Sequence, residues 1–89
     1  MKSLLTESFL KQYRKLPEEV RTLARKNYQL WSADPTHKSL QFKKVSPNQP
    51  IWSVRVGDHY RAVGAITDNT IHWFFIGSHA EYDRLLRKR

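Results

Sequence analysis

Apolar side chains recur at helical spacing through the first third of the chain. One stripe belongs to a helix for which Thr6 is the expected N-cap, and it consists of Phe9, Tyr13 and Leu16. A second stripe, at spacings of three and four, consists of Val20, Leu23, Ala24, Tyr28 and Trp31. Pro17 separates the two helices, and Asp34 with Pro35 ends the second. The pattern predicts a helical hairpin.

The hydrophobic period becomes alternating after about residue 40. Four runs are predicted as strands, at residues 40–45, 51–56, 60–66 and 70–77. The segments between them contain Gly, Pro, Asn and Asp, which favour turns, so consecutive strands are predicted to pair as antiparallel hairpins. Residues 2–5 are compatible with a further short strand.

Ser78 and Glu81 form a capping-box pattern directly after the last run, which predicts a short C-terminal helix. The elements together predict an α+β fold, with an N-terminal helical hairpin packed on one face of a three- to four-stranded antiparallel sheet. Because 89 residues enclose only one core, residues 1–89 are predicted to form a single domain.

The turns also predict a register that sorts the strand side chains onto two faces. Placing Val56 opposite Tyr60 and Thr67 opposite Thr70 puts Arg55 directly opposite Arg61. The face beneath the helices is then predicted to hold Trp52, Val54, Val56, Tyr60, Ala62, Gly64, Ile66, Ile71, Trp73 and Phe75. The opposite face is predicted to be open and to hold Ser53, Arg55, Arg61, Val63, Ala65, His72, Phe74 and Ile76. Gly64 falls between Trp52 and Trp73, where a larger side chain is expected to clash.

The charge of the chain predicts an anionic partner. Lys and Arg number 16 against 8 Asp and Glu, a formal net charge of +8, which suits a polyanion or an acidic protein. The basic residues are spread through the predicted fold, apart from a closing group of Arg84, Arg87, Lys88 and Arg89. The chain has no Cys, which excludes thiolate catalysis and sulfur-ligated zinc and favours a cytoplasmic protein. No apolar run is long enough to span a membrane.

Arg55 and Arg61 are the first candidate site residues, because guanidinium groups bind phosphate in bidentate fashion. The alternatives are solvated arginines or a pair bridged by an acidic side chain. Lys43 and Lys44 are candidates for RNA binding, and since they face opposite sides of their strand only one can reach the arginine face. Phe74 is a candidate for base stacking.

His79 and Tyr82 are the candidates for proton transfer, because both fall in the first turn of the C-terminal helix. Histidine exchanges a proton near neutral pH, which suits a general base. The alternative is that Tyr82 packs with Leu85 and Leu86 while His79 is only exposed. The histidines have no metal-ligand spacing and there is no glycine-rich phosphate loop, so neither a metal nor a cofactor is predicted.

The whole sequence resembles the RelE/ParE toxin superfamily. The resemblance rests on the helical hairpin and on three segments, Ser39–Lys43, Trp52–Ala62 and Phe75–Tyr82. It implies the toxin of a type II toxin-antitoxin pair, neutralised by an acidic antitoxin. The RelE branch cleaves messenger RNA in the ribosomal decoding site without a metal, so the resemblance implies an endoribonuclease.

By resemblance, Arg61 matches the phosphate-stabilising arginine, Arg55 and Lys43 match basic strand positions, and His79 and Tyr82 match the acid/base positions. The Gly-Ser-His context is similar to that of YafQ-like members. The chain departs from YoeB-like members because it has no glutamate on the arginine face to act as base. Alternatives are a ParE-like inhibitor of DNA gyrase on the same fold, a protein that only binds its antitoxin, and a plain RNA-binding domain.

Overall fold

The first helix follows a short strand and begins at a threonine cap. In the computed structural model, which describes residues 1–87, β1 spans Lys2–Leu5 and α1 spans Glu7–Arg14. The Oγ1 atom of Thr6 accepts a hydrogen bond from the Phe9 backbone N–H at 3.2 Å. Such a cap stabilises a helix by about 1 kcal/mol, so Thr6 sets the start of α1 as predicted. Lys88 and Arg89 lie outside the described residues.

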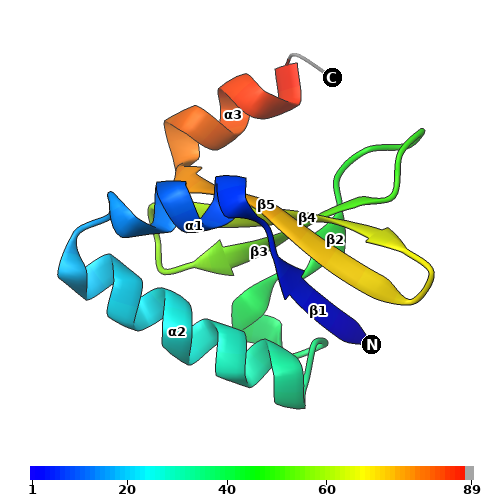
Figure 1. Cartoon of the computed structure of the whole chain (residues 1–89), viewed down its shortest axis with the longest axis horizontal. Helices are drawn as coiled ribbons and strands as arrows, with labels where there is room; N and C mark the ends of the chain where they lie inside the picture. Colours follow the sequence, from blue (N-terminus) through cyan, green and yellow to red (C-terminus); the bar gives the residue numbers. More distant parts are fainter. Residues whose placement is uncertain (88–89) are drawn as a thin grey trace.

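The second helix, α2, spans Glu18–Ala33, with Pro17 at its N-cap and Asp34 at its C-cap. The predicted helical hairpin is therefore confirmed, and α1 and α2 lie against the same side of the sheet (Figure 1). No helix within residues 1–87 has the length and hydropathy needed to cross a membrane.

The predicted strand at 40–45 is shorter than expected. A 3-10 turn, η1, spans Lys38–Leu40, and only Lys43–Lys44 form the strand β2. Leu40 is completely buried, and Gln41 after it has a left-handed backbone with φ of 47°. Extended geometry is therefore impossible at Gln41, and the chain enters the sheet two residues later.

The sheet has five strands in the order β1-β5-β4-β3-β2. The remaining strands are β3 at Ile51–Val56, β4 at Tyr60–Thr67 and β5 at Thr70–Ser78. Consecutive strands from β2 to β5 pair as antiparallel neighbours, as predicted, whereas β1 pairs with β5 in parallel. The α+β class is confirmed, and the sheet is mixed and has more strands than the three to four predicted.

The predicted register is confirmed near both hairpin turns. Arg55 lies opposite Arg61 between β3 and β4, and Thr67 lies opposite Thr70 between β4 and β5. The two arginines are therefore neighbours on one face of the sheet, which is called the arginine face below.

A β-bulge makes the predicted face of two residues wrong. Val63 lies opposite Phe75, and the residue after Val63 lies opposite Trp73, so Phe74 is the extra residue of the bulge. One extra residue shifts the alternation of the strand by one position. Phe75 consequently lies on the arginine face, and Ile76, which is 3% exposed, packs in the core beneath the helices.

Helix α1 stabilises this bulge through one side chain. The Nε2 atom of Gln12 donates to the Phe74 carbonyl at 3.1 Å, and its Oε1 atom accepts from the Ile76 N–H at 3.2 Å. The Oγ of Ser8 also donates to the Phe74 carbonyl, at 3.3 Å. Side chains of α1 thus bind backbone groups where the strand pairing is interrupted.

The main core lies between the helical hairpin and the sheet. It joins buried residues of both layers, namely Phe9, Leu16, Val20, Trp31, Leu40, Val54, Val56, Ala62, Ile71, Trp73 and Ile76. A Cβ atom at Gly64 would lie 2.7 Å from Ile71 and 3.0 Å from Trp73. The predicted crowding against Trp73 is therefore confirmed, while Trp52 instead stacks on Phe42 at 4.8 Å.

The arginine face is only partly open, because α3, at His79–Arg87, covers one end of it (Figure 1). The predicted capping box is present: the Glu81 N–H donates to Ser78 Oγ at 3.2 Å, and Glu81 Oε1 accepts from the Ser78 N–H at 2.8 Å. Tyr82 packs with Ile51 and Val63, and Val63 is completely buried. Val63 and Ile76, both predicted to lie on an open face, are therefore both buried.

Candidate functional site

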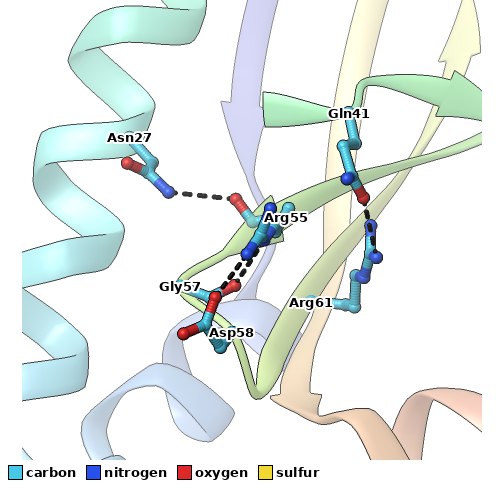
Figure 2. Close-up of polar contacts among 6 residues, drawn as sticks. All are labelled: Asn27, Gln41, Arg55, Gly57, Asp58 and Arg61. Atoms are coloured by element: carbon cyan, nitrogen blue, oxygen red, sulfur yellow. Dashed lines mark hydrogen bonds and ion pairs between the residues drawn. The ribbon is translucent and has the colours of Figure 1, made fainter. Parts of the chain in front are cut away.

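Arg55 is held by the turn that follows its strand. Its Nε donates to the Gly57 carbonyl at 2.9 Å, and its Nη2 forms an ion pair with Asp58 (Figure 2). The Asn27 amide donates to the Arg55 carbonyl at 3.0 Å and joins the strand to α2. The two charged side chains are 35% and 75% exposed, so solvent screens the pair and its contribution to stability is at most about 1 kcal/mol. Among the described residues Asp58 pairs with Arg55 and not with Arg61, so it does not bridge the two arginines as the alternative interpretation expected.

Arg61 has no carboxylate partner within residues 1–87. Its Nη2 donates to Gln41 Oε1 at 3.0 Å, and its Cζ atom lies 5.8 Å from the centroid of the Tyr82 ring. Its other terminal nitrogen, Nη1, is buried and has no hydrogen-bond partner among the described residues. A guanidinium that is oriented by neutral groups keeps its full charge for an anionic ligand.

The ring of Tyr82 lies beneath this guanidinium. Tyr82 is 6% exposed, and its hydroxyl donates to the Oγ of Ser53, a completely buried residue, at 3.3 Å. The hydroxyl therefore faces the protein interior rather than a bound ligand. Tyr82 also packs with Leu85 and Leu86, as the alternative interpretation expected. Its ring contacts the Arg61 guanidinium, and a cation over a tyrosine ring is stabilised by about 0.5–2 kcal/mol.

His79 lies beside the same ring. The two ring centroids are 5.7 Å apart in an edge arrangement, and the histidine side chain is 52% exposed. Its Nδ1 lies 3.3 Å from Asp83 Oδ2, and its backbone N–H donates to the His59 carbonyl at 2.8 Å. A carboxylate beside one ring nitrogen orients the imidazole and leaves Nε2 for proton exchange.

The register of β2 against β3 determines which lysine lies on the arginine face. Lys43 lies opposite Ser53, on the arginine face, whereas Lys44 lies opposite Trp52, on the other face. Since β4 lies between β5 and β3 in the sheet, Arg61 stands between the strand that leads to His79 and the edge that carries Lys43.

Phe74 lies at the bulge and packs beside the cluster of Ile51, Val63 and Tyr82. The structure thus places Arg61 and His79 against Tyr82. Lys43 and Arg55 lie on the same face of the sheet, while Lys44 lies on the other face.

Three contacts of this site were not predicted. The contact of Asp58 with Arg55 could have been predicted, because Asp58 lies three residues after Arg55 in a turn that the sequence indicates. No local pattern indicated the contact of Gln41 with Arg61 or that of Ser53 with Tyr82, because these contacts join segments 20 and 29 residues apart in the sequence. No group of three His, Asp or Glu side chains within residues 1–87 is arranged to hold a metal ion.

Comparisons with known proteins agree on one fold. The family model described as the ParE-like toxin domain matches residues 18–84, which is more than half of the chain. Comparison with curated protein sequences gives no significant match.

Solved structures with this fold include a chain of the RelB-RelE antitoxin-toxin complex from Methanococcus jannaschii, with a TM-score of 0.72 and 19% identity over 91% of this chain and 96% of that one. YafQ from Escherichia coli has a TM-score of 0.73 and 10% identity over 91% and 96% of the two chains. A YoeB/ParE toxin from Agrobacterium tumefaciens has a TM-score of 0.69 and 14% identity over 89% and 99%. At these identities the similarity is one of fold.

Proposed function

Since the chain belongs to the ParE-like toxin domain family and has the fold of RelE/ParE toxins, we propose that this toxin is an endoribonuclease that cleaves messenger RNA on the ribosome, in the cytoplasm. The observation that carries the proposal is the arrangement around Tyr82. Arg61, which has no carboxylate partner among the described residues, and the half-exposed His79 both lie against its ring. Metal-independent RNA cleavage requires a cation for the phosphate, a proton acceptor and a proton donor, and the groups against Tyr82 supply the first two.

The proposed reaction is attack of a ribose 2′-hydroxyl on the adjacent phosphorus. His79 accepts the hydroxyl proton, the new O2′–P bond forms, and the P–O5′ bond breaks to give a cyclic phosphate. Arg61 stabilises the negative charge that develops on the phosphoryl oxygens. Lys43, on the opposite side of Arg61 from His79, is the proposed donor of a proton to the leaving 5′-oxygen.

A second candidate function is inhibition of DNA gyrase by binding. The name of the matching family favours it, because the family is described as ParE-like. This function needs no proton-transfer groups, so it gives His79 and Arg61 no chemical role.

Purified protein is expected to cut a translated message in the presence of ribosomes and to leave gyrase activity unchanged. Primer extension on a translated messenger RNA locates the cuts, and a supercoiling assay with purified gyrase runs beside it. Cuts that appear only when translation is active support the proposal. Intact message together with gyrase-dependent DNA breaks contradicts the nuclease function and supports the gyrase inhibitor.

We also propose that the partner is an acidic antitoxin that covers the apolar groove between the helical hairpin and the sheet. A cavity of about 240 Å³ lies there, with Leu10, Tyr28 and Trp31 among its lining residues and Arg25 beside them. An apolar groove with a basic side chain, on a chain with a net charge of +8, suits an acidic protein with apolar anchors. The matched structure from Methanococcus jannaschii is itself an antitoxin-toxin complex.

Expression of the unmutated chain alone is expected to arrest bacterial growth. Co-expression with the short acidic protein expected in the neighbouring reading frame is expected to restore growth, because charge and apolar complementarity favour the complex. Colony counts with each protein alone and with both together measure the effect. Normal growth with soluble, folded toxin alone contradicts the proposed toxicity.

A further inference from the structure

Gln41 has a backbone conformation that glutamine rarely adopts. Its φ and ψ are 47° and 45°, in the left-handed region. The other non-glycine residues with positive φ in the part of the chain described, Asp68 and Asn69, form the tight turn between β4 and β5, where Asp and Asn are common. Glutamine gains nothing from this conformation, so a glycine would fit the backbone at position 41 more easily.

The residues on either side explain why the backbone turns here. Leu40 is completely buried. Phe42 stacks on Trp52 at 4.8 Å and meets the edge of Trp31 at 5.7 Å. With both neighbours fixed in the core, the chain must reverse at residue 41. These contacts explain the backbone and leave the choice of side chain unexplained.

The side chain of Gln41 reaches Arg61. Its Oε1 accepts the hydrogen bond from Arg61 Nη2 at 3.0 Å, and Figure 2 shows the amide extending from the segment before β2 to the guanidinium on β4. An amide orients a guanidinium without neutralising it. Arg55 provides the contrast, because its partner Asp58 is a carboxylate.

We propose that Gln41 is a positioning residue of the RNA site, whose amide holds the Arg61 guanidinium over Tyr82 with its charge intact. This inference rests on the proposed endoribonuclease function. Gln41 acts from one side of the guanidinium and the Tyr82 ring acts from beneath it. The same short segment, from the C-cap of η1 to the start of β2, carries both Gln41 and Lys43 on the arginine face, so it supplies a positioning group and a cation.

The proposal predicts opposite effects of Gln41→Gly on stability and on activity. Glycine suits the left-handed backbone, so Tm is expected to stay unchanged or to rise by a few degrees. Loss of the neutral hydrogen bond is expected to lower RNA cleavage about five- to tenfold, because Arg61 loses its fixed orientation. Order of the Arg61 side chain, measured as the heteronuclear NOE of its Nε–Hε group in the free, full-length protein, is expected to fall.

Two further variants separate orientation from charge. Gln41→Asn tolerates the backbone but is one methylene shorter, so it is expected to behave like Gln41→Gly. Gln41→Glu still reaches Arg61 but neutralises it, so it is expected to keep the side chain ordered while lowering cleavage and RNA affinity. Asn69→Gly, at one of the two left-handed residues of the β4–β5 turn, is the matched control and is expected to leave cleavage unchanged.

The NOE measurement needs no RNA, so it decides the positioning role separately from the nuclease function. An Arg61 side chain that stays equally ordered in Gln41→Gly overturns the proposal. Cleavage by Gln41→Gly at the rate of the unmutated protein also overturns it. If the unmutated protein cuts no message, the proposed function fails, whereas the NOE still reports whether Gln41 orients Arg61.

Discussion

Replacing Arg61 with alanine is expected to lower messenger RNA cleavage by about 100- to 1,000-fold and to weaken RNA binding as well. In the proposed reaction the guanidinium contacts phosphate both before and during the attack, so its loss is expected to affect the bound state and the transition state. Removing one phosphate contact should also reduce the slope of log affinity against log salt by about one. Primer extension measures cleavage, and sedimentation with ribosomes at several salt concentrations measures binding.

Arg55→Ala is the matched control for Arg61→Ala, because the two residues lie opposite each other on the same face. Arg55 already has Asp58 and the Gly57 carbonyl as partners, so we expect a smaller loss of cleavage than at Arg61. Arg61→Lys keeps the charge but loses the planar fork that meets both phosphate and Gln41, so an intermediate loss is expected. Equal activity of Arg61→Ala and the unmutated protein would refute the phosphate role.

His79→Gln is expected to lower cleavage by about 100-fold or more while leaving ribosome binding almost unchanged. Glutamine keeps a polar side chain of similar length but cannot exchange a proton near neutral pH. A loss of turnover without a loss of binding identifies a group that acts in the transition state. The same primer-extension and sedimentation assays separate the two effects.

Tyr82→Phe is the control that tests whether the proton passes through the tyrosine instead. The Tyr82 hydroxyl contacts the buried Ser53, so its removal should cost little cleavage while the ring still supports Arg61. Asp83→Asn should reduce cleavage only in part, because the carboxylate orients His79 and does not itself transfer the proton. Full cleavage by His79→Gln together with lost cleavage by Tyr82→Phe would show that Tyr82, and not His79, transfers the proton.

Local features of the sequence were sufficient for the helices, the hairpins and the pairing of the arginines. Thr6 and Pro17 act on the residues next to them, so helix boundaries can be predicted from short windows. The pairing of Arg55 with Arg61 is equally local, because the short turn at Gly57–His59 determines the register of its own strands. The capping box at Ser78 and Glu81 likewise fixed the start of the C-terminal helix.

Only the tertiary structure determined what surrounds these residues. The bulge at Phe74 moves Phe75 and Ile76 to faces opposite to those predicted, and the Gln12 side chain that stabilises it comes from a helix more than 60 residues away in the sequence.

The contacts of the Arg61 side chain were likewise determined only by the tertiary structure. Gln41 and Tyr82 belong to segments on either side of its strand, and each reaches the guanidinium only after the sheet has formed. Periodicity and turn chemistry act over a few residues, whereas these contacts depend on how distant segments pack. The sequence alone therefore determined where the candidate site lies on the sheet. Packing determined how the Arg61 guanidinium is oriented, by Gln41 and Tyr82 and without a carboxylate partner among the described residues.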